Sequence, residues 1–294
     1  SFTVAATVKN AADLQNADIC SGSRRGEHPD IDYTLIDLAA VGGRQGSSTP
    51  DYTLANGSFY NDAGYCSTSQ ATASVAGAAA NLKHHFLTIF DPADVNEPGL
   101  IHASMLAMGD GQLEIPIHAG KTTPNDPRWG AGRMRMRLLT GPGMDSPWRW
   151  RYYIGVLGDG QVKYVNLHPD AYGVNQPVPE EAEFFTAALW YHEPNLDYYA
   201  GEVPADIALR VQQSPSAGYT CSSYGPRSQR LTLGDDLNGG AWKVKLTGLN
   251  IPAGTDPDDQ LHNEEKRKVF LAFYWEDGAW DDPNGPNTPM RYEP

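Results

Sequence analysis

The stretch that decides the fold of the first half of the chain reads CSTSQATASVAGAAANLKHHF and covers residues 66–86. Alanine is the best helix former, so this composition predicts a helix from about Ser69 to Phe86. Its small side chains predict close packing on all sides, and therefore a buried central helix. A second helix is expected over residues 97–108, because Pro98 suits a first helical turn.

Hydroxyl side chains stand where the preceding loop turns into this helix, at Ser67, Thr68 and Ser69. A helix N-terminus presents unpaired N–H groups and a partial positive charge of about half an electron. Those groups can stabilise an oxyanion beside a nucleophilic serine, which makes Ser69 a candidate nucleophile. The residue types alone are also satisfied by a simple N-cap, for which Ser and Thr are preferred. Cys66 is an alternative nucleophile, but it lies in the loop, outside the best position of the helix dipole.

The same segment resembles the serine motif of the subtilases, the subtilisin-like serine proteases, which reads G-T-S-x-A-x-P-x-V-A-G. Ser69 falls on the nucleophile and Thr68 matches, whereas Ser67 replaces a Gly and Ala73 replaces the Pro. The resemblance implies peptide-bond hydrolysis through an acyl-enzyme at Ser69. It also implies that the Ser69 backbone N–H donates to the oxyanion, and that Cys66, Ser67 and Thr68 form the oxyanion and substrate loop.

Three further segments resemble subtilase patterns in the family order. Residues 2–7 (FTVAAT) resemble the strand I-T-V-G-A, residues 37–43 (DLAAVGG) resemble D-x-x-A-P-G, and residues 128–134 (RWGAGRM) resemble W/Y-G-x-G. The resemblance extends from residue 1 to about residue 138. It implies the C-terminal half of a subtilisin-like α/β domain with a parallel sheet.

A catalytic serine needs a base and a carboxylate that orients the base. In subtilases the Asp, the His and the oxyanion-hole Asn all precede the serine, and the patterns D-T-G and H-G-T are absent from this sequence. His28 stands in the turn-like context E-H-P-D, so it is not expected to be the base. His84 and His85 lie about 23 Å of helix rise beyond Ser69 and cannot reach it.

Three explanations of the missing groups remain: a companion chain cut from the same precursor, an inactive protease-like protein, or a shortened recombinant chain. We expect the companion chain, carrying the Asp, the His and the oxyanion Asn. Residues 2–8 would form an interior strand of a parallel sheet, and an uncovered apolar edge is an aggregation liability. The function predicted is a serine endopeptidase acting on peptide or protein substrates, and the alternative is an inactive subtilase-like binding or structural protein.

The second half of the chain predicts an all-β sandwich or jelly roll, since short strands alternate with turn signals such as Gly158-Asp159-Gly160. It resembles the β-sandwich modules that follow the catalytic domains of bacterial secreted subtilases. We therefore predict two domains, residues 1–144 and 145–294, with an irregular tail from residue 280. The strands are expected at residues 149–157, 161–167, 184–191, 206–212, 229–233, 241–246 and 268–275.

Charge and cysteine content limit the partners. The chain has 22 basic and 36 acidic residues and a net charge of −14, which disfavours binding to nucleic acid. No apolar run approaches the length of a membrane span. The sequence opens at Ser1 in a strand pattern, so we expect Ser1 to be a processing point and the protein to be secreted or extracytoplasmic. Three cysteines allow one disulfide at most, and a Cys20–Cys66 bridge is one option.

No cofactor is required by the sequence, but several acidic clusters would suit Ca²⁺. They lie at residues 206, 235–236, 256–259 and 281–282. Because no D-x-D-x-D-G loop is present, solvated acidic loops are the preferred interpretation, and no metal ligand is assigned. The aromatic residues of the strands would suit a carbohydrate platform, with sandwich core as the preferred alternative.

Overall fold

The computed structural model describes the helices, most strands and their immediate flanks. The described residues are 3–10, 23, 27–28, 31–34, 36–45, 52–53, 59–60, 67–89, 97–109, 130–132, 134, 150–166, 184–192, 205–214, 221–223, 228–234, 241–253 and 264–276. The chain forms two compact units. Unit 1 comprises Ser1–Asn81, Gly109–Pro116 and Asn125–Arg135, and unit 2 comprises Leu82–Met108, Ile117–Pro124 and Met136–Pro294. The boundary predicted between residues 144 and 145 lies outside the described residues.

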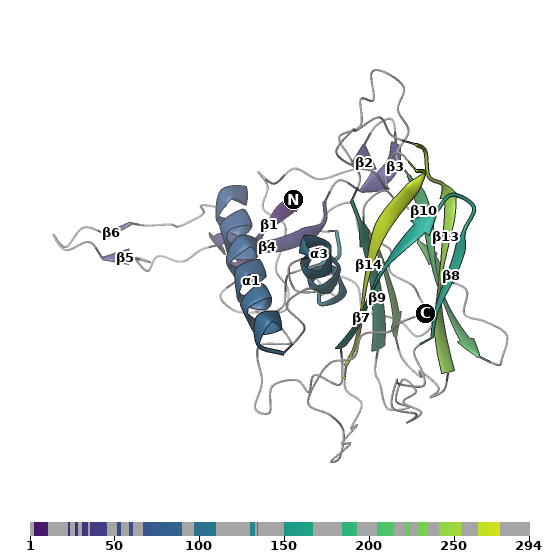
Figure 1. The fold of residues 1–294 in the computed structure, drawn as a ribbon. Helices are drawn as coiled ribbons and strands as arrows, with labels where there is room; N and C mark the ends of the chain where they lie inside the picture. Colours follow the sequence, from purple (N-terminus) through teal and green to yellow (C-terminus); the bar gives the residue numbers. More distant parts are fainter. Residues whose placement is uncertain are drawn as a thin grey trace, which may run out of the picture. The chain divides into compact units, whose positions relative to one another are not determined.

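The described chain is mostly β, with antiparallel sheets arranged as a β-sandwich, two helices and a small parallel strand pair (Figure 1). The helices are α1 (Thr68–Ile89) and α3 (Pro98–Ala107). The strands of unit 1 are β1 (Val4–Asn10), β2 (Glu27–His28), β3 (Ile31–Thr34), β4 (Leu38–Gln45), β5 (Tyr52–Thr53) and β6 (Phe59–Tyr60). The strands of unit 2 are β7 (Trp150–Gly158), β8 (Val162–Asn166), β9 (Phe184–Tyr191), β10 (Asp206–Ser214), β11 (Cys221–Ser223), β12 (Ser228–Gly234), β13 (Ala241–Asn250) and β14 (Lys266–Glu276).

Unit 2 contains the sandwich, whose two layers are visible in Figure 1. One antiparallel sheet has the order β11-β10-β13-β8 and the other has the order β12-β9-β14-β7. Side chains alternate along each strand, so one face of every strand points into the shared interior. Leu209 lies opposite Leu246 in the first sheet, and Leu271 lies opposite Leu189 in the second. All four leucines are buried, as this alternation requires.

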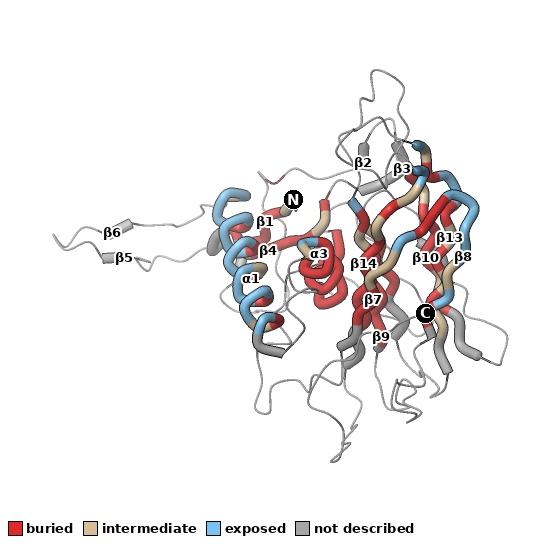
Figure 2. Tube along the Cα trace, viewed as in Figure 1, coloured by how far each residue is buried: buried red, intermediate tan, exposed pale blue. Residues whose placement is uncertain are grey.

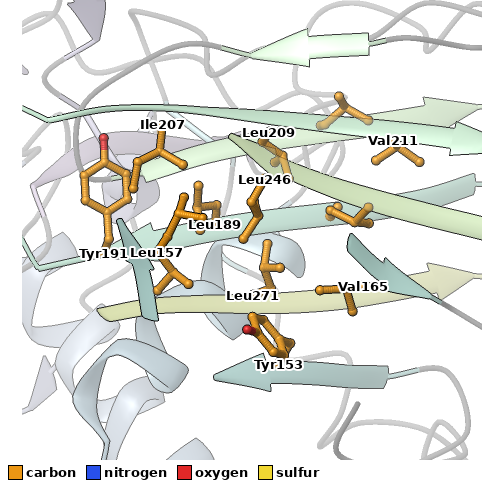
Figure 3. Packing of buried hydrophobic residues seen from close by; sticks show 14 of the residues in the cluster. Tyr153, Leu157, Val165, Leu189, Tyr191, Ile207, Leu209, Val211, Leu246 and Leu271 are labelled. Carbon is orange, nitrogen blue, oxygen red and sulfur yellow. The ribbon is translucent and has the colours of Figure 1, made fainter. Parts of the chain in front are cut away.

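The sandwich interior is one aliphatic and aromatic cluster (Figure 3). Its polar groups are satisfied locally: the Tyr191 hydroxyl donates to the carbonyl oxygen of Ala205 at 2.9 Å. Burying such a phenol without a partner would be costly. The cluster consists of Tyr153, Leu157, Val165, Phe185, Ala187, Leu189, Tyr191, Ala205, Ile207, Leu209, Val211, Leu231, Val244, Leu246, Ile251, Val269, Leu271 and Phe273.

Helix α3 packs on the outer face of the β12-β9-β14-β7 sheet. Gly99 makes this close approach feasible, because a Cβ at Gly99 would lie 2.2 Å from the Phe270 ring. The His102 ring stacks on Trp190 with 4.7 Å between centroids, and Lys268 forms an ion pair with Glu97 at the helix start. Nearly all of α3 is buried, as Figure 2 shows. A helix that is apolar all round is expected to be covered in this way.

Unit 1 is organised around the parallel pair β1-β4, in which Val4 lies opposite Leu38 and Ala6 opposite Ala40. Both faces of the pair are buried, which is typical of parallel strands. The segment at residues 130–134 runs along the other side of β4. Ala39 N–H donates to Gly132 O at 2.9 Å, and Met134 N–H donates to Ala39 O at 2.7 Å, which is a parallel bonding pattern.

Helix α1 begins at Thr68 and so confirms the helix predicted from about Ser69, but its environment corrects one expectation. The prediction of a helix buried on all sides is wrong: one stripe is buried and most other positions are exposed (Figure 2). Alanine favours a helix through its intrinsic propensity, whether or not the side chain is covered. The buried residues recur at helical spacing and are Ala71, Val75, Ala78, Leu82 and Phe86.

The predicted strands of the second half are confirmed, with ends displaced by a few residues. The Gly158-Asp159-Gly160 turn is also confirmed: Gly160 has φ 65°, and the Asp159 carboxylate accepts a hydrogen bond from Ile251 N–H at 2.8 Å. The prediction missed the short strand β11, whose three residues, Cys221–Ser223, carry no alternation. It also missed β5 and β6 within the Gly- and Ser-rich residues 42–64.

Candidate functional site

Ser69 occupies the first turn of α1 and is exposed, as is its neighbour Thr68. Ser67 stands immediately before the helix and is half-buried. The Ser67 carbonyl accepts a hydrogen bond from Ala71 N–H at 3.2 Å, which is the first intrahelical bond. Ser67 is therefore the N-cap residue of α1. Cys66 lies outside the described residues.

The start of α1 is attached to strand β4 through the backbone. Ser67 N–H donates to the carbonyl oxygen of Gly42 at 2.8 Å. A Cβ on Gly42 would lie 2.6 Å from Ser67 O and 2.7 Å from the Ala6 Cβ. The glycine therefore permits a close approach between the carboxyl-terminal part of β4, its neighbour β1 and the serine segment. This contact fixes the place where Ser69 begins the helix.

Gly42→Ala is expected to lower the free energy of unfolding by about 1–3 kcal/mol. The added methyl group would overlap both the Ser67 carbonyl oxygen and the Ala6 Cβ, and relieving both overlaps requires a backbone shift. Urea unfolding followed by circular dichroism measures this effect. Gly77→Ala is the matched control, since a Cβ at Gly77 meets nothing within 4 Å on an exposed helical position. The control is expected to gain about 0.5–1 kcal/mol from the better helix propensity of alanine. Equal effects of the two substitutions would contradict the packing described for Gly42.

A second glycine shapes the other side of β4. Gly130 has φ 61°, and a Cβ there would lie 2.3 Å from Ile36 O. Ala131 N–H then donates to Asp37 O at 2.8 Å, while the Asp37 carboxylate accepts a hydrogen bond from Thr3 N–H at 2.8 Å. The structure thus brings together four stretches that are far apart in sequence: residues 3–7, 37–43, 67–71 and 130–134.

The electrostatics of the helix start differ from the expectation for an open oxyanion site. Ser69 N–H, the predicted oxyanion donor, is engaged by the Ser67 hydroxyl at 3.1 Å. An N-cap side chain satisfies one of the otherwise unpaired N–H groups of the first turn, and here it satisfies that of Ser69. The sequence signal for this contact is Ser67 itself, because a glycine at that position would carry no side chain to compete.

No hydrogen bond to the Ser69 hydroxyl is found in the part of the chain that the structure describes. His84 and His85 belong to α1, and 15 or 16 residues of helix place them about 23 Å of rise from Ser69. His28 is in β2, where it lies opposite Ile31. Among the described residues, the two histidines of α1 therefore cannot reach Ser69.

His85 is half-buried, and burial together with the charge of neighbouring His84 lowers the pKa of His85 below its usual value. As the pH falls through about 6.5, His85 becomes protonated in the unfolded chain but stays neutral in the folded protein. The free energy of unfolding therefore decreases as the pH falls through and below that value. We expect the urea midpoint of unfolding to fall less between pH 7.5 and pH 5 in the His85→Gln protein than in the unchanged protein. Urea unfolding at each pH measures the two midpoints.

Lys83→Gln is the control for this pH dependence, because it removes an exposed neighbouring charge and leaves both histidines in place. Its urea midpoints are expected to run parallel to those of the unchanged protein. His84→Gln should diminish the pH dependence in part, since it removes the repulsion that His84 exerts on His85. Identical slopes for the unchanged protein and His85→Gln would refute the linkage.

Metal ligands are not assembled in the described residues, among which no group of three or more His, Cys, Asp or Glu could hold an ion. Asp206, at the start of β10, is half-buried, and burial raises the pKa of its carboxyl. The other predicted calcium positions, at residues 235–236, 256–259 and 281–282, lie outside the described residues, as do Cys20 and Cys66 of the suggested disulfide. In the described part of the chain, no helix has the length and apolar character needed to cross a membrane.

No protein-family model matches the chain, and no curated protein matches its sequence. Among solved structures, the chain is similar to the crystal structure of the Yersinia pseudotuberculosis-derived mitogen, at 13% identity and a TM-score of 0.23. That match covers 45% of this chain and 91% of the other.

Proposed function

We propose that the chain is the serine-bearing part of a subtilisin-type serine endopeptidase with Ser69 as the nucleophile. The observation that carries the proposal is the exposed Ser69 in the first turn of α1, held at the carboxyl-terminal part of the parallel strand β4. Reactive groups of α/β sheets gather at the carboxyl ends of parallel strands, where helix N-termini stabilise negative charge.

The four stretches that resemble subtilase patterns also lie beside one another in unit 1, which supports the same assignment. Strands β1 and β4 and the segment at residues 130–134 are neighbours, and the serine segment is bonded to β4. Sequence resemblance gives only the order of these stretches along the chain. A subtilisin-like domain also requires that the four stretches pack against one another.

The base, the carboxylate and the oxyanion Asn come from a companion chain in this proposal. Strand β1 is at the edge of its sheet in the described residues, although Ala5, Ala6 and Thr7 are buried. Its outward-facing Ala6 N–H donates to the Ser23 hydroxyl at 3.0 Å rather than to another strand. Helix α1 exposes Ala73 and other small residues. A parallel strand that lacks a second partner strand and an exposed helix face of small residues are surfaces that a companion chain would cover.

In the assembled enzyme the Ser69 oxygen attacks the substrate carbonyl carbon while its proton passes to the companion histidine. The resulting oxyanion needs hydrogen-bond donors, and Ser69 N–H serves as one of them once the Ser67 hydroxyl releases it. Collapse of the intermediate breaks the C–N bond, and the histidine gives its proton to the leaving amine. Water then hydrolyses the ester at Ser69 and restores the hydroxyl.

A second candidate function is that of an inactive subtilase-like binding or structural protein. The contact between the Ser67 hydroxyl and Ser69 N–H favours it, because this contact occupies the donor that an oxyanion requires. The lack of a base near Ser69 in the described residues is compatible with either candidate.

Native mass spectrometry of the purified material, with a denaturing run beside it, separates the two candidates. A co-purifying polypeptide that contains D-T/S-G and H-G-T patterns, together with labelling of Ser69 by a fluorophosphonate, is expected for the protease. A lone 32.0 kDa chain whose Ser69 is not labelled would reject the protease and leave the inactive protein. Peptide mapping of the labelled chain identifies the modified residue.

A further inference from the structure

The β11-β10-β13-β8 sheet has an outer face that is basic, although the whole chain has a net charge of −14. Val244 and Leu246 of β13 point into the sandwich and are buried. Side chains alternate along a strand, so Lys243 and Lys245 point to the opposite, outer face. Both lysines are partly exposed.

The neighbouring strand β8 adds apolar groups to the same face. Tyr164 lies opposite Lys245, and Val162 lies opposite Thr247, in the β13-β8 register. Tyr164 is 48% exposed and Val162 is 42% exposed. The Lys245 Nζ lies 6.0 Å from the centroid of the Tyr164 ring, at the outer limit of a cation–π contact. We call the surface formed by Lys243, Lys245, Tyr164, Val162 and Leu249 the basic face.

Acidic side chains do not neutralise the two lysines in the described part of the chain. The ion pairs seen there join Lys266 to Glu264 and Lys268 to Glu97, and the lysine of each pair belongs to strand β14 of the other sheet. Across the sheet, the residue opposite Lys245 on β10 is a third cation, Arg210, which has an interaction of its own within the chain. The basic face therefore carries positive charge, although the chain as a whole has a net negative charge.

We propose that the basic face binds an extended acidic peptide segment of a partner protein. Alternate side chains of an extended chain lie about 6.6–6.8 Å apart, the same spacing that separates Lys243 from Lys245 along β13. Carboxylates at positions i and i+2 of the peptide then face the two lysines. An apolar residue at i+6 faces Leu249, which is 48% exposed on the same strand.

The apolar part of the face favours a peptide over other polyanions. Val162 and Leu249 offer aliphatic contact area to peptide side chains but no additional charge, whereas a sulfated polysaccharide would be held mainly by its charge. The negative charge elsewhere on the chain does not prevent this binding at physiological salt, because charges more than about 8 Å away are largely screened. Exposed ion pairs are individually weak, so a weak complex that is sensitive to salt is expected.

Fluorescence anisotropy with the dye-labelled peptide GDSDSSSLG tests the proposal, with GNSNSSSLG as the neutral control peptide. The Ser69→Ala protein is used, so the result does not depend on the proposed hydrolysis. The acidic peptide is expected to bind, and the double substitution Lys243→Gln/Lys245→Gln should weaken binding about tenfold or more. Leu249→Ser, an exposed substitution, should weaken it to a smaller extent, and added salt should weaken it further.

Lys83→Gln/Lys266→Gln is the matched control, because it changes the net charge equally at two lysines outside the basic face. It is expected to leave the affinity unchanged, and thermal melting confirms that each variant is folded. Absence of binding, equal affinity for both peptides, or equal losses in the two double variants would overturn the proposal. If a heparin oligosaccharide binds more tightly than the acidic peptide, and its binding depends on Lys243 and Lys245, the ligand of the basic face is a polysaccharide and the peptide proposal is rejected.

Discussion

Ser69→Ala is expected to abolish peptide hydrolysis by the purified assembly, with turnover reduced by a factor of order 10⁶. In the proposed mechanism the substitution removes the atom that would form the acyl-enzyme, while the exposed position allows the helix to accept alanine without strain. Turnover of a fluorogenic peptide library measures the loss. Native mass spectrometry of the variant should show the same assembly as the unchanged protein, because the Ser69 side chain is exposed among the described residues.

Ser74→Ala is the matched control for Ser69→Ala. Ser74 is an exposed serine of the same helix, and its hydroxyl donates to Gln70 O at 3.0 Å. Its removal is expected to leave turnover unchanged. Activity that survives Ser69→Ala but is lost in Cys66→Ser would transfer the nucleophile to the alternative residue of the serine segment. Activity that survives both substitutions would remove this segment from catalysis.

Ser67→Gly is expected to raise kcat/KM of the assembled protease by about 10²–10³-fold if the Ser67 hydroxyl stays on Ser69 N–H during the reaction. The substitution releases the backbone donor that the hydroxyl now engages at 3.1 Å. A glycine N-cap costs only a few tenths of a kcal/mol relative to serine, so stability should change little. Steady-state kinetics and urea unfolding of the same preparations measure the two effects.

Ser67→Thr separates the hydroxyl from the backbone change. Threonine keeps a capping oxygen, so Ser67→Thr is expected to have the same kcat/KM as the unchanged protein. Ser67→Ala removes the oxygen without adding backbone freedom and should raise kcat/KM as Ser67→Gly does. Equal activity in all four proteins would show that the cap does not compete with the oxyanion.

Much of the secondary structure follows from local sequence. The alanine-rich composition predicts α1, and the alternation of apolar and polar residues predicts β13. These features depend on neighbours within a few residues, which is the range of helix propensity and of strand alternation. The ends differ by a few residues because hydrogen bonding to other segments extends strands such as β13, which reaches Asn250.

The candidate site is less predictable than the elements that hold it. The motif identifies Ser69, but the engagement of its N–H depends on the rotamer of Ser67 and on the bond from Ser67 N–H to Gly42. The exposure of most of α1 likewise could not be read from a run of small residues, since such residues suit both a covered and an open helix.

The sequence by itself determined where α1 begins, which strands other than β11 form the sandwich, and which serine stands at the helix start, because propensity, alternation and capping act locally. Only the tertiary structure decided that Gly42 must be a glycine, that α3 packs on the β12-β9-β14-β7 sheet, and that Lys243 and Lys245 share a face with Tyr164. These three features depend on contacts between residues that are far apart in the chain. Strand order and register decide which residues come into contact, and both are fixed by the packing of whole sheets.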